Sequence, residues 1–224
     1  MNQENRDAQG RPVRDRALPF VKAFFPAARA FSVPDKEAGD IPDREACAAL
    51  WDKYAMPAHI RAHSRQVAMI VEHLEGFVRA AGIRLDPALL MAGALLHDIA
   101  KAYTISFGGN HAQLGAAWMA REGISPRAAQ MILHHVHWPW QLDIRNESML
   151  PSLILVYADK RVLHDAVVGL EERFKDLTRR YGHTERIRMF IASSMAQGRD
   201  LEHLLSELSG VRLDEYSFDC GRLV

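Results

Sequence analysis

The chain has 224 residues, which is enough for one sizeable hydrophobic core. Its 28 lysine and arginine residues balance 28 aspartate and glutamate residues, so neither nucleic acid nor an anionic membrane is an expected partner. The two cysteines, Cys47 and Cys220, are too few for a disulfide framework or a thiolate metal site. This composition favours a reducing, cytoplasmic environment.

Residues 1–43 are predicted to form a tail and a linker. Residues 1–17 are polar, as is typical of a disordered tail. The apolar stretch Leu18–Phe25 is short, is interrupted by Lys22 and lacks the features of a signal peptide. Its three phenylalanines are expected to pack back on the core rather than engage a partner. No other run reaches the roughly 18 to 20 apolar residues that span a bilayer.

From residue 44 to residue 209 apolar residues recur with a helical period, and no segment alternates as a strand does. We therefore expect an all-α fold, a single helical bundle followed by an irregular tail over residues 210–224. Prolines, glycines and capping residues indicate where the helices end. Helices are predicted at about residues 44–54, 58–81, 87–103, 111–123 and from 126 to Trp138, then from 151 to 170 or even 181, with two more between 184 and 208.

Histidine and aspartate side chains interrupt the apolar faces of these predicted helices. His63 shares one face with apolar residues at helical spacing. His97 and Asp98 lie at the end of a nearly uncharged helix, and Asp159 follows the apolar run Ile154–Ala158. Each residue alone could be a hydrogen-bonded core residue. Together they favour a mixed histidine and carboxylate metal site, because one divalent ion would satisfy all these buried groups.

The order of these residues resembles the HD-domain superfamily of metal-dependent phosphohydrolases, whose pattern is a histidine, a His-Asp pair and a distant aspartate. The matching segments are His63-Ser64-Arg65, Leu96-His97-Asp98-Ile99 and Tyr157-Ala158-Asp159. The resemblance covers roughly residues 50–165. It implies that residues 44–209 form an HD-type metal-binding domain with extra C-terminal helices.

Two further histidines resemble the extra pair of HD proteins with binuclear sites, among them bacterial dinucleoside-tetraphosphate hydrolases. One is His111 and the other is His135, although His134 and His137 are alternatives to His135. The resemblance implies two divalent ions, which could be Fe, Mn, Co, Ni, Mg or Zn. It assigns the first ion to His63, His97, Asp98 and Asp159, and the second to Asp98 as a bridge with His111 and His135.

The predicted activity is hydrolysis of a small phosphorylated substrate, such as a nucleotide, by a metal-bound hydroxide. The sequence has no Ser-His-Asp or Cys-His signature and no glycine-rich phosphate loop. Asp98 and Lys101 are the catalytic candidates, and Lys101 could either neutralise a phosphate oxygen or be a solvated residue at a helix end. Trp138 and Trp140 could stack on a base, although aromatic plugs that close a bundle are commoner.

Other interpretations of these residues stay open. A similar scaffold occurs in HD-type di-iron oxygenases, and a third possibility is a non-catalytic, metal-stabilised sensor or binding module. Lys160 and Arg161 follow Asp159 and could bind phosphate or be solvated. The charged segment Glu171–Phe174 is expected to be a surface without a chemical role. The sequence leaves the oligomeric state open.

Overall fold

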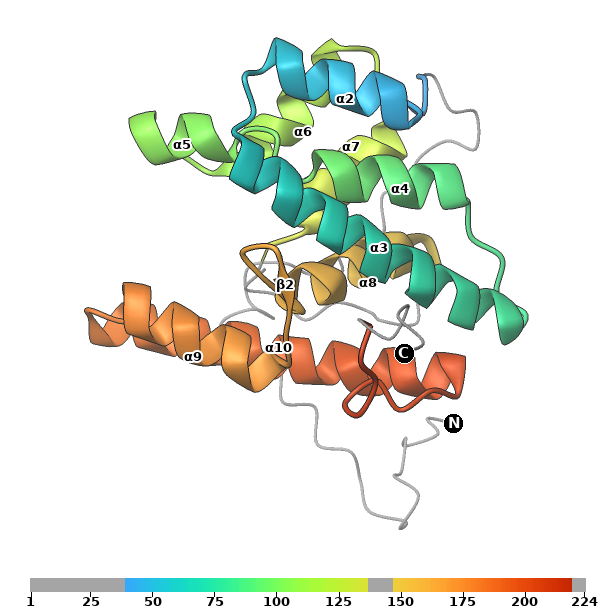
Figure 1. Ribbon diagram of the computed structural model, residues 1–224, viewed down its shortest axis with the longest axis vertical. Coiled ribbons are helices and arrows are strands. Elements are labelled where there is room, and N and C mark those ends of the chain that lie inside the picture. The colour runs from blue at the N-terminus through green and yellow to red at the C-terminus, as the bar shows by residue number, and fades with distance from the viewer. Residues whose placement is uncertain (1–38, 137–146, 219–224) are drawn as a thin grey trace, which may run out of the picture. The chain divides into compact units, whose positions relative to one another are not determined.

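A computed structural model describes residues 39–136 and 147–218 (Figure 1). The fold is all-α, as predicted. Its elements are α2 (Arg44–Lys53), α3 (Ala58–Ala80), α4 (Pro87–Leu96), α5 (Lys101–Phe107), α6 (His111–Arg121), α7 (Pro126–His134), a 3-10 turn (Glu147–Met149), α8 (Leu150–Lys160), β1 (Val162–Leu163), β2 (Ala166–Val167), α9 (Leu170–Tyr181) and α10 (Glu185–Ser209). The predictions for residues 1–38, His137, Trp138 and Trp140 lie outside the described residues.

Side-chain caps start several helices where the sequence indicated. Asp43 accepts a hydrogen bond from the Ala46 amide at 2.8 Å and begins α2. Asp86, Asn110 and Ser125 accept equivalent amide bonds at the starts of α4, α6 and α7. These bonds satisfy first-turn amides that have no partner within the helix. They fix the start of α4, whose other end leads into the His-Asp pair, and the start of α6 at His111.

The helix predicted from residue 87 to about residue 103 is wrong, because the chain breaks at the His-Asp pair. α4 ends at Leu96 and α5 begins at Lys101. Between them the Ile99 amide donates to the Leu96 carbonyl at 3.1 Å, and the Lys101 amide donates to the Asp98 carbonyl at 2.9 Å. Both bonds reach back three residues rather than four, as in a 3-10 turn. The apolar pattern runs through this turn and therefore hides it.

By length and composition, Pro87–Phe107 is the one stretch of the described residues that could cross a membrane, with a mean hydropathy of 1.2. Lys101 interrupts the apolar residues of this stretch. Within the fold 61 % of this stretch is buried, and the buried core helix of a soluble protein passes the same test. The stretch is therefore weak support for a membrane span.

The long helix predicted from residue 151 to 170 or beyond is also wrong. α8 ends at Lys160, and a short antiparallel hairpin pairs Val162 with Val167 before α9 begins. His164 takes a left-handed backbone conformation at this turn, with φ of 58°. Glycine or asparagine usually marks such a turn, so this turn could not be predicted from the residue at position 164.

The two helices predicted after Thr184 are a single helix, α10. Gly198 lies in its middle, where a Cβ atom would come within 3.2 Å of the Lys160 side chain. This glycine permits close packing between α10 and the end of α8 rather than ending a helix. The sequence alone does not distinguish these two uses of glycine.

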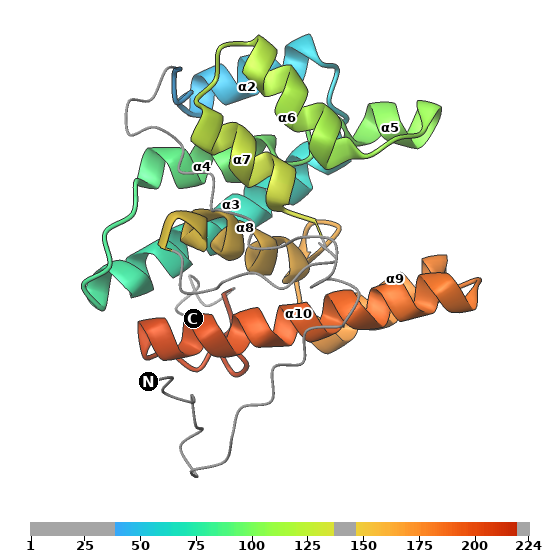
Figure 2. The same cartoon turned by 180° about the vertical axis from the view of Figure 1, so that it is seen from behind.

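α3 packs on α4, α8 and α10, and α7 packs on α4, α6 and α8 (Figures 1 and 2). α8 is the most deeply buried helix, since all but one of its residues are buried. The apolar core therefore forms around α3, α4 and α8. The ends of these helices and of α7 carry the predicted metal ligands.

Residues 210–218 are irregular, as predicted, yet they pack on the fold through buried Leu213 and Phe218. Buried Arg161 anchors them by donating to the carbonyls of Leu213 at 2.9 Å and Tyr216 at 3.1 Å. It also donates to the Tyr157 hydroxyl at 2.5 Å. Arg161 is thus a structural residue rather than a solvated one.

Arg161→Ala is expected to lower the free energy of unfolding by about 3 kcal/mol, because it leaves several buried acceptors without a donor. Urea unfolding followed by circular dichroism measures this loss. Arg199→Ala is the matched control, since Arg199 pairs with Glu171 on the exposed surface and should contribute less than about 0.5 kcal/mol. Equal losses in the two variants would contradict the anchoring role.

Candidate metal centre

The structure brings together all six residues predicted to ligate metal. His63 comes from α3, and Asp159 comes from the end of α8. The His-Asp pair comes from the turn after α4, His111 opens α6, and His135 follows the last residue of α7. Two overlapping groups of these residues could each hold a metal ion, because the ligand atoms within each group lie within 4.8 Å of one another. One group is His63, His97 and Asp159, and the other is His97, Asp98 and His135.

One side of the cluster surrounds Oδ2 of Asp98. This oxygen lies 3.4 Å from His97 Nε2 and 3.7 Å from His63 Nε2. His63 Nε2 is also 2.9 Å from Asp159 Oδ1, which is 3.9 Å from His97 Nε2. Two imidazoles and two carboxylates therefore converge here from three separate parts of the chain.

The other side of the cluster surrounds Oδ1 of Asp98. This oxygen lies 3.4 Å from His111 Nε2 and 3.7 Å from His135 Nε2. The two histidine nitrogens are 3.0 Å apart. The carboxylate of Asp98 thus presents one oxygen to each half of the cluster, and His97 belongs to both groupings by distance alone.

Backbone carbonyls orient three of the histidine rings. The Nδ1 atom of His63 donates to the His164 carbonyl at 2.9 Å, that of His97 to the Ala94 carbonyl at 2.7 Å, and that of His135 to the Ile132 carbonyl at 2.6 Å. A neutral imidazole that carries its proton on Nδ1 has a lone pair on Nε2. In their neutral forms all three rings therefore direct Nε2 lone pairs into the cluster, as metal-ligating histidines do.

These donor atoms fit a divalent cation. Asp98 and His97 are fully buried, and neither Asp98 Oδ1 nor His97 Nε2 has a hydrogen-bond partner among the described residues. Lone pairs and carboxylate oxygens at such short separations repel one another unless a positive charge lies between them. Nitrogen and oxygen ligands of this kind suit zinc, iron, manganese, cobalt or nickel.

The charge states also suit metal binding near neutral pH. Burial acts to raise the pKa of Asp98, but Lys101 and His97 hold it well below the usual range. Asp159 is mostly shielded from solvent, which acts to raise its pKa, but His63 and His97 keep this pKa well below the usual range. Burial and the neighbouring His135 lower the pKa of His111 to about 4. The carboxylates are therefore ionised and His111 is neutral, which is the form each needs as a ligand.

Lys101, predicted to act in catalysis, lies at the edge of the cluster and donates to Asp98 Oδ2 at 2.6 Å. It is partly exposed but bonded to the site, and its catalytic role stays a prediction. His135, rather than His134, directs its ring at Asp98. His137 lies outside the described residues.

The sequence reasoning missed two contributors to the centre. The carbonyl of His164, in the β1–β2 hairpin, orients His63. Arg173, expected to have no chemical role, is one of the positive charges that keep the pKa of Asp159 low. Both depend on the chain turning back after α8, which the prediction of one continuous helix concealed.

Residues 60–165 match the HD domain family. This segment includes every residue of the cluster. The resemblance inferred from the sequence is confirmed at this level, whereas the binuclear dinucleoside-tetraphosphate branch stays a prediction. HD domains bind divalent metals, in agreement with the donor atoms described above.

Several curated proteins are similar to the chain. Ribonuclease Y from Opitutus terrae is 24 % identical over 164 residues, which are 69 % of this chain and 28 % of that protein. A tRNA (cytidine(56)-2'-O)-methyltransferase from Thermoplasma volcanium is 33 % identical over 96 residues, 43 % of this chain and 26 % of that protein. Ribonuclease Y from Acidothermus cellulolyticus is 49 % identical over 51 residues, 23 % of this chain and 10 % of that protein.

The chain thus spans less than a third of the length of each of these relatives. No solved structure matches the chain significantly. The similarity to these relatives is consistent with the match to the HD domain family. The matched segment ends at residue 165, before α9 and α10.

Proposed function

We propose that this chain is a metal-dependent phosphohydrolase whose HD centre holds two divalent ions and acts on a small phosphorylated substrate such as a nucleotide. The observation that carries the proposal is the carboxylate of Asp98, whose two oxygens face two separate sets of histidines. A carboxylate in this position is suited to bridge two ions. The match to the HD domain family supports the hydrolase class. We also propose the substrate class and a cytoplasmic location, which rest on the sequence alone.

Bound divalent cations supply Lewis acidity, which polarises a phosphoryl group and makes water a stronger acid. The protein contributes fixed geometry: backbone carbonyls hold His63, His97 and His135 in the ligating tautomer. Asp98 is held ionised between the two sets of histidines. Lys101, bonded to Asp98, brings a positive charge that can neutralise a non-bridging phosphate oxygen.

A second candidate substrate is RNA, because two of the relatives are named ribonuclease Y. The balanced charge of the chain argues against it, since RNA binding generally requires a positive surface. The same metal centre would cleave a phosphodiester in this case. Only the substrate, and not the reaction class, would differ.

The test is an assay of the purified chain with Mn, Fe, Co, Ni, Mg and Zn in turn. The substrates are dinucleoside polyphosphates, mononucleotides, cyclic nucleotides and a short single-stranded RNA. Phosphate release or phosphodiester cleavage should require one of these metals and stop on chelation. His97→Ala should lower the rate by at least about a thousandfold, because it removes a ligand of the metal that activates the reaction.

His203→Ala is the matched control, because His203 lies exposed on α10 and its removal should leave the rate unchanged. Oxygen consumption by an iron-loaded protein that is inert to every phosphoester would instead support the di-iron oxygenase. Metal binding with neither activity would support the sensor or binding module.

A further inference from the structure

The first turn of α9 lies against the end of α8 that carries Asp159. The ammonium of Lys160, which follows Asp159, is 6.0 Å from the ring centroid of buried Phe174. Arg173 precedes Phe174 and is three residues after buried Leu170, so it borders the buried face of α9. Arg173 is itself partly buried. Its side chain therefore leaves α9 close to the aspartate end of the metal centre.

Arg173 differs from the other arginines of α9. Arg179 and Arg180 both pair with Asp176, at the other end of the helix. Arg173 has no ion pair or hydrogen bond from its side chain within residues 39–136 and 147–218. A partly buried guanidinium that is not needed for an internal ion pair is available to bind an anion.

The charge of Arg173 reaches three groups around the metal centre. Burial lowers the pKa of Lys160 to about 8, and Arg173 adds to this lowering. The pKa of Lys101, at the start of α5, is raised by Asp98, while burial and the charge of Arg173 act to lower it. The charge of Arg173 also helps to lower the pKa of Asp159. α5 and α9 extend toward the same side in Figure 1, and Figure 2 shows the same arrangement from behind.

We propose that Arg173 binds the phosphate group of the substrate at the HD centre, so that α9, outside the HD segment, completes the substrate site. The proposal rests on the proposed function. The six ligand residues present acceptor atoms to a cation, and Lys101 is engaged by Asp98. Arg173 offers uncommitted N–H donors beside them, and a guanidinium can donate two parallel bonds to phosphate oxygens. The substrate class is accordingly one with an accessible, anionic phosphate group.

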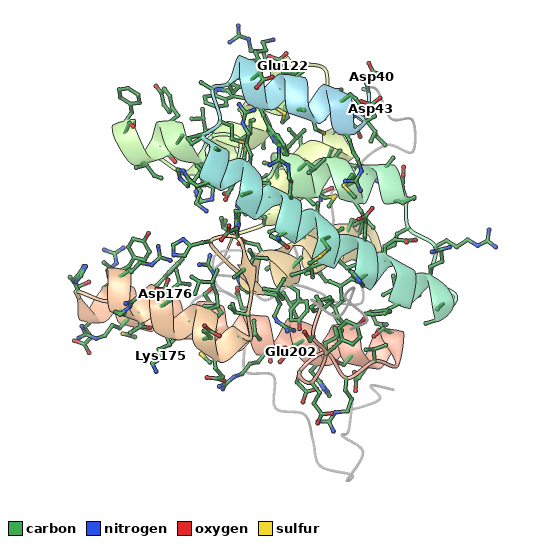
Figure 3. All side chains as sticks on the ribbon, viewed as in Figure 1. Asp40, Asp43, Glu122, Lys175, Asp176 and Glu202 are labelled. Carbon is green, nitrogen blue, oxygen red and sulfur yellow. The ribbon has the colours of Figure 1, made fainter. Side chains whose placement is uncertain are left out.

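The test compares Arg173→Ala and Arg173→Lys with Lys175→Ala, all in the full chain loaded with Mn²⁺. Lys175 is exposed on the same helix and points away from α5 (Figure 3). Its loss removes one positive charge from α9 without touching the site. Calorimetry with inorganic phosphate measures anion affinity, and titration with Mn²⁺ measures metal affinity.

Arg173→Ala should weaken phosphate binding at least about tenfold, the effect of losing a charge-assisted hydrogen bond. Arg173→Lys should recover part of this loss, and Lys175→Ala should bind phosphate as the wild type does. With p-nitrophenyl phosphate the loss should appear in KM more than in kcat. Unchanged phosphate affinity in Arg173→Ala, with or without tighter Mn²⁺ binding, would overturn the proposal and leave Arg173 as a counter-charge to Asp159.

Failure of the proposed function is distinguishable from failure of this inference. A wild-type protein that hydrolyses no phosphoester but binds phosphate through Arg173 would refute the hydrolase and retain the phosphate site. Normal hydrolysis and phosphate binding in Arg173→Ala would retain the hydrolase and refute the role of Arg173.

Discussion

If the centre holds two ions as proposed, Asp98→Asn is expected to remove both of them, whereas His97→Ala should remove one. The two oxygens of Asp98 face different halves of the cluster, with His97 Nε2 3.4 Å from Oδ2 and His111 Nε2 3.4 Å from Oδ1. Asparagine keeps the shape of the side chain but has one acceptor oxygen and no charge. Imidazole Nε2 has a single lone pair, so His97 can ligate only one ion even though it lies near both groups.

The measurement is the ratio of bound metal to protein after desalting, determined for wild type and both variants. The rate of phosphoester hydrolysis should fall by at least about a thousandfold in Asp98→Asn, because no metal remains to activate the reaction. Circular dichroism should show a native helical content, since partly exposed Lys101 can turn to solvent when its partner loses its charge.

Asp200→Asn provides the matched control, because Asp200 is exposed on α10 and the substitution is chemically the same. Its metal content and rate should equal those of the wild type. A single ion in the wild type, or two ions retained in Asp98→Asn, would contradict the bridging role of Asp98.

Four of the six candidate ligands could be predicted from the sequence because they interrupt local apolar patterns, whereas His111 and His135 followed from the family resemblance. His63 shares a helix face with residues that are buried in the fold, such as Ile60, Val67 and Ile70. Asp159 follows five buried residues, Ile154–Ala158. Helical periodicity determines which side of a helix is buried, and a polar residue on that side requires a partner.

The path of the chain between the ligands could not be predicted in the same way. The turn at residues 97–100 has an apolar sequence on both sides, and the left-handed turn at His164 has no glycine. Both depend on packing between distant segments. His164 is fixed by its bond to His63, a residue 101 positions earlier in the chain.

The contribution of α9 was hidden for the same reason. A continuous helix from α8 would carry Arg173 far beyond Asp159, since a helix rises about 1.5 Å per residue. The hairpin instead returns the chain, and Phe174 comes to lie against Lys160. Local patterns therefore predicted candidate ligands that the fold brings together, but not the residues that surround them.

Acidification of the metal-free protein from pH 6.5 to pH 4 is expected to lower the free energy of unfolding through His111. Burial and His135 lower the pKa of His111 from 6.5 to about 4 in the folded state. Between these two pH values the unfolded chain binds a proton that the folded protein does not. The contribution of His111 is therefore fully present above pH 6.5, is lost as the pH falls, and changes no further below pH 4.

This lowering of the His111 pKa corresponds to about 3 kcal/mol in the free energy of unfolding, since one pKa unit is worth about 1.4 kcal/mol. The His111 side chain is 28 % exposed, so solvent screening should reduce the effect to about 2 kcal/mol. His134, whose pKa burial also lowers, adds a separate loss of the same sign. Asp98 and Asp159 extend the decline at lower pH, because their lowered pKa values stabilise the fold only while they are ionised.

Urea unfolding at pH 7, 5.5 and 4.5, with a chelator present, isolates the contribution of His111. His111→Gln should show a decline between pH 7 and 4.5 that is about 2 kcal/mol smaller than in the wild type, because glutamine does not titrate. His203→Gln, on the exposed surface of α10, should keep the wild-type dependence. Identical pH dependence in wild type and His111→Gln would show that His111 is not held neutral by the folded protein.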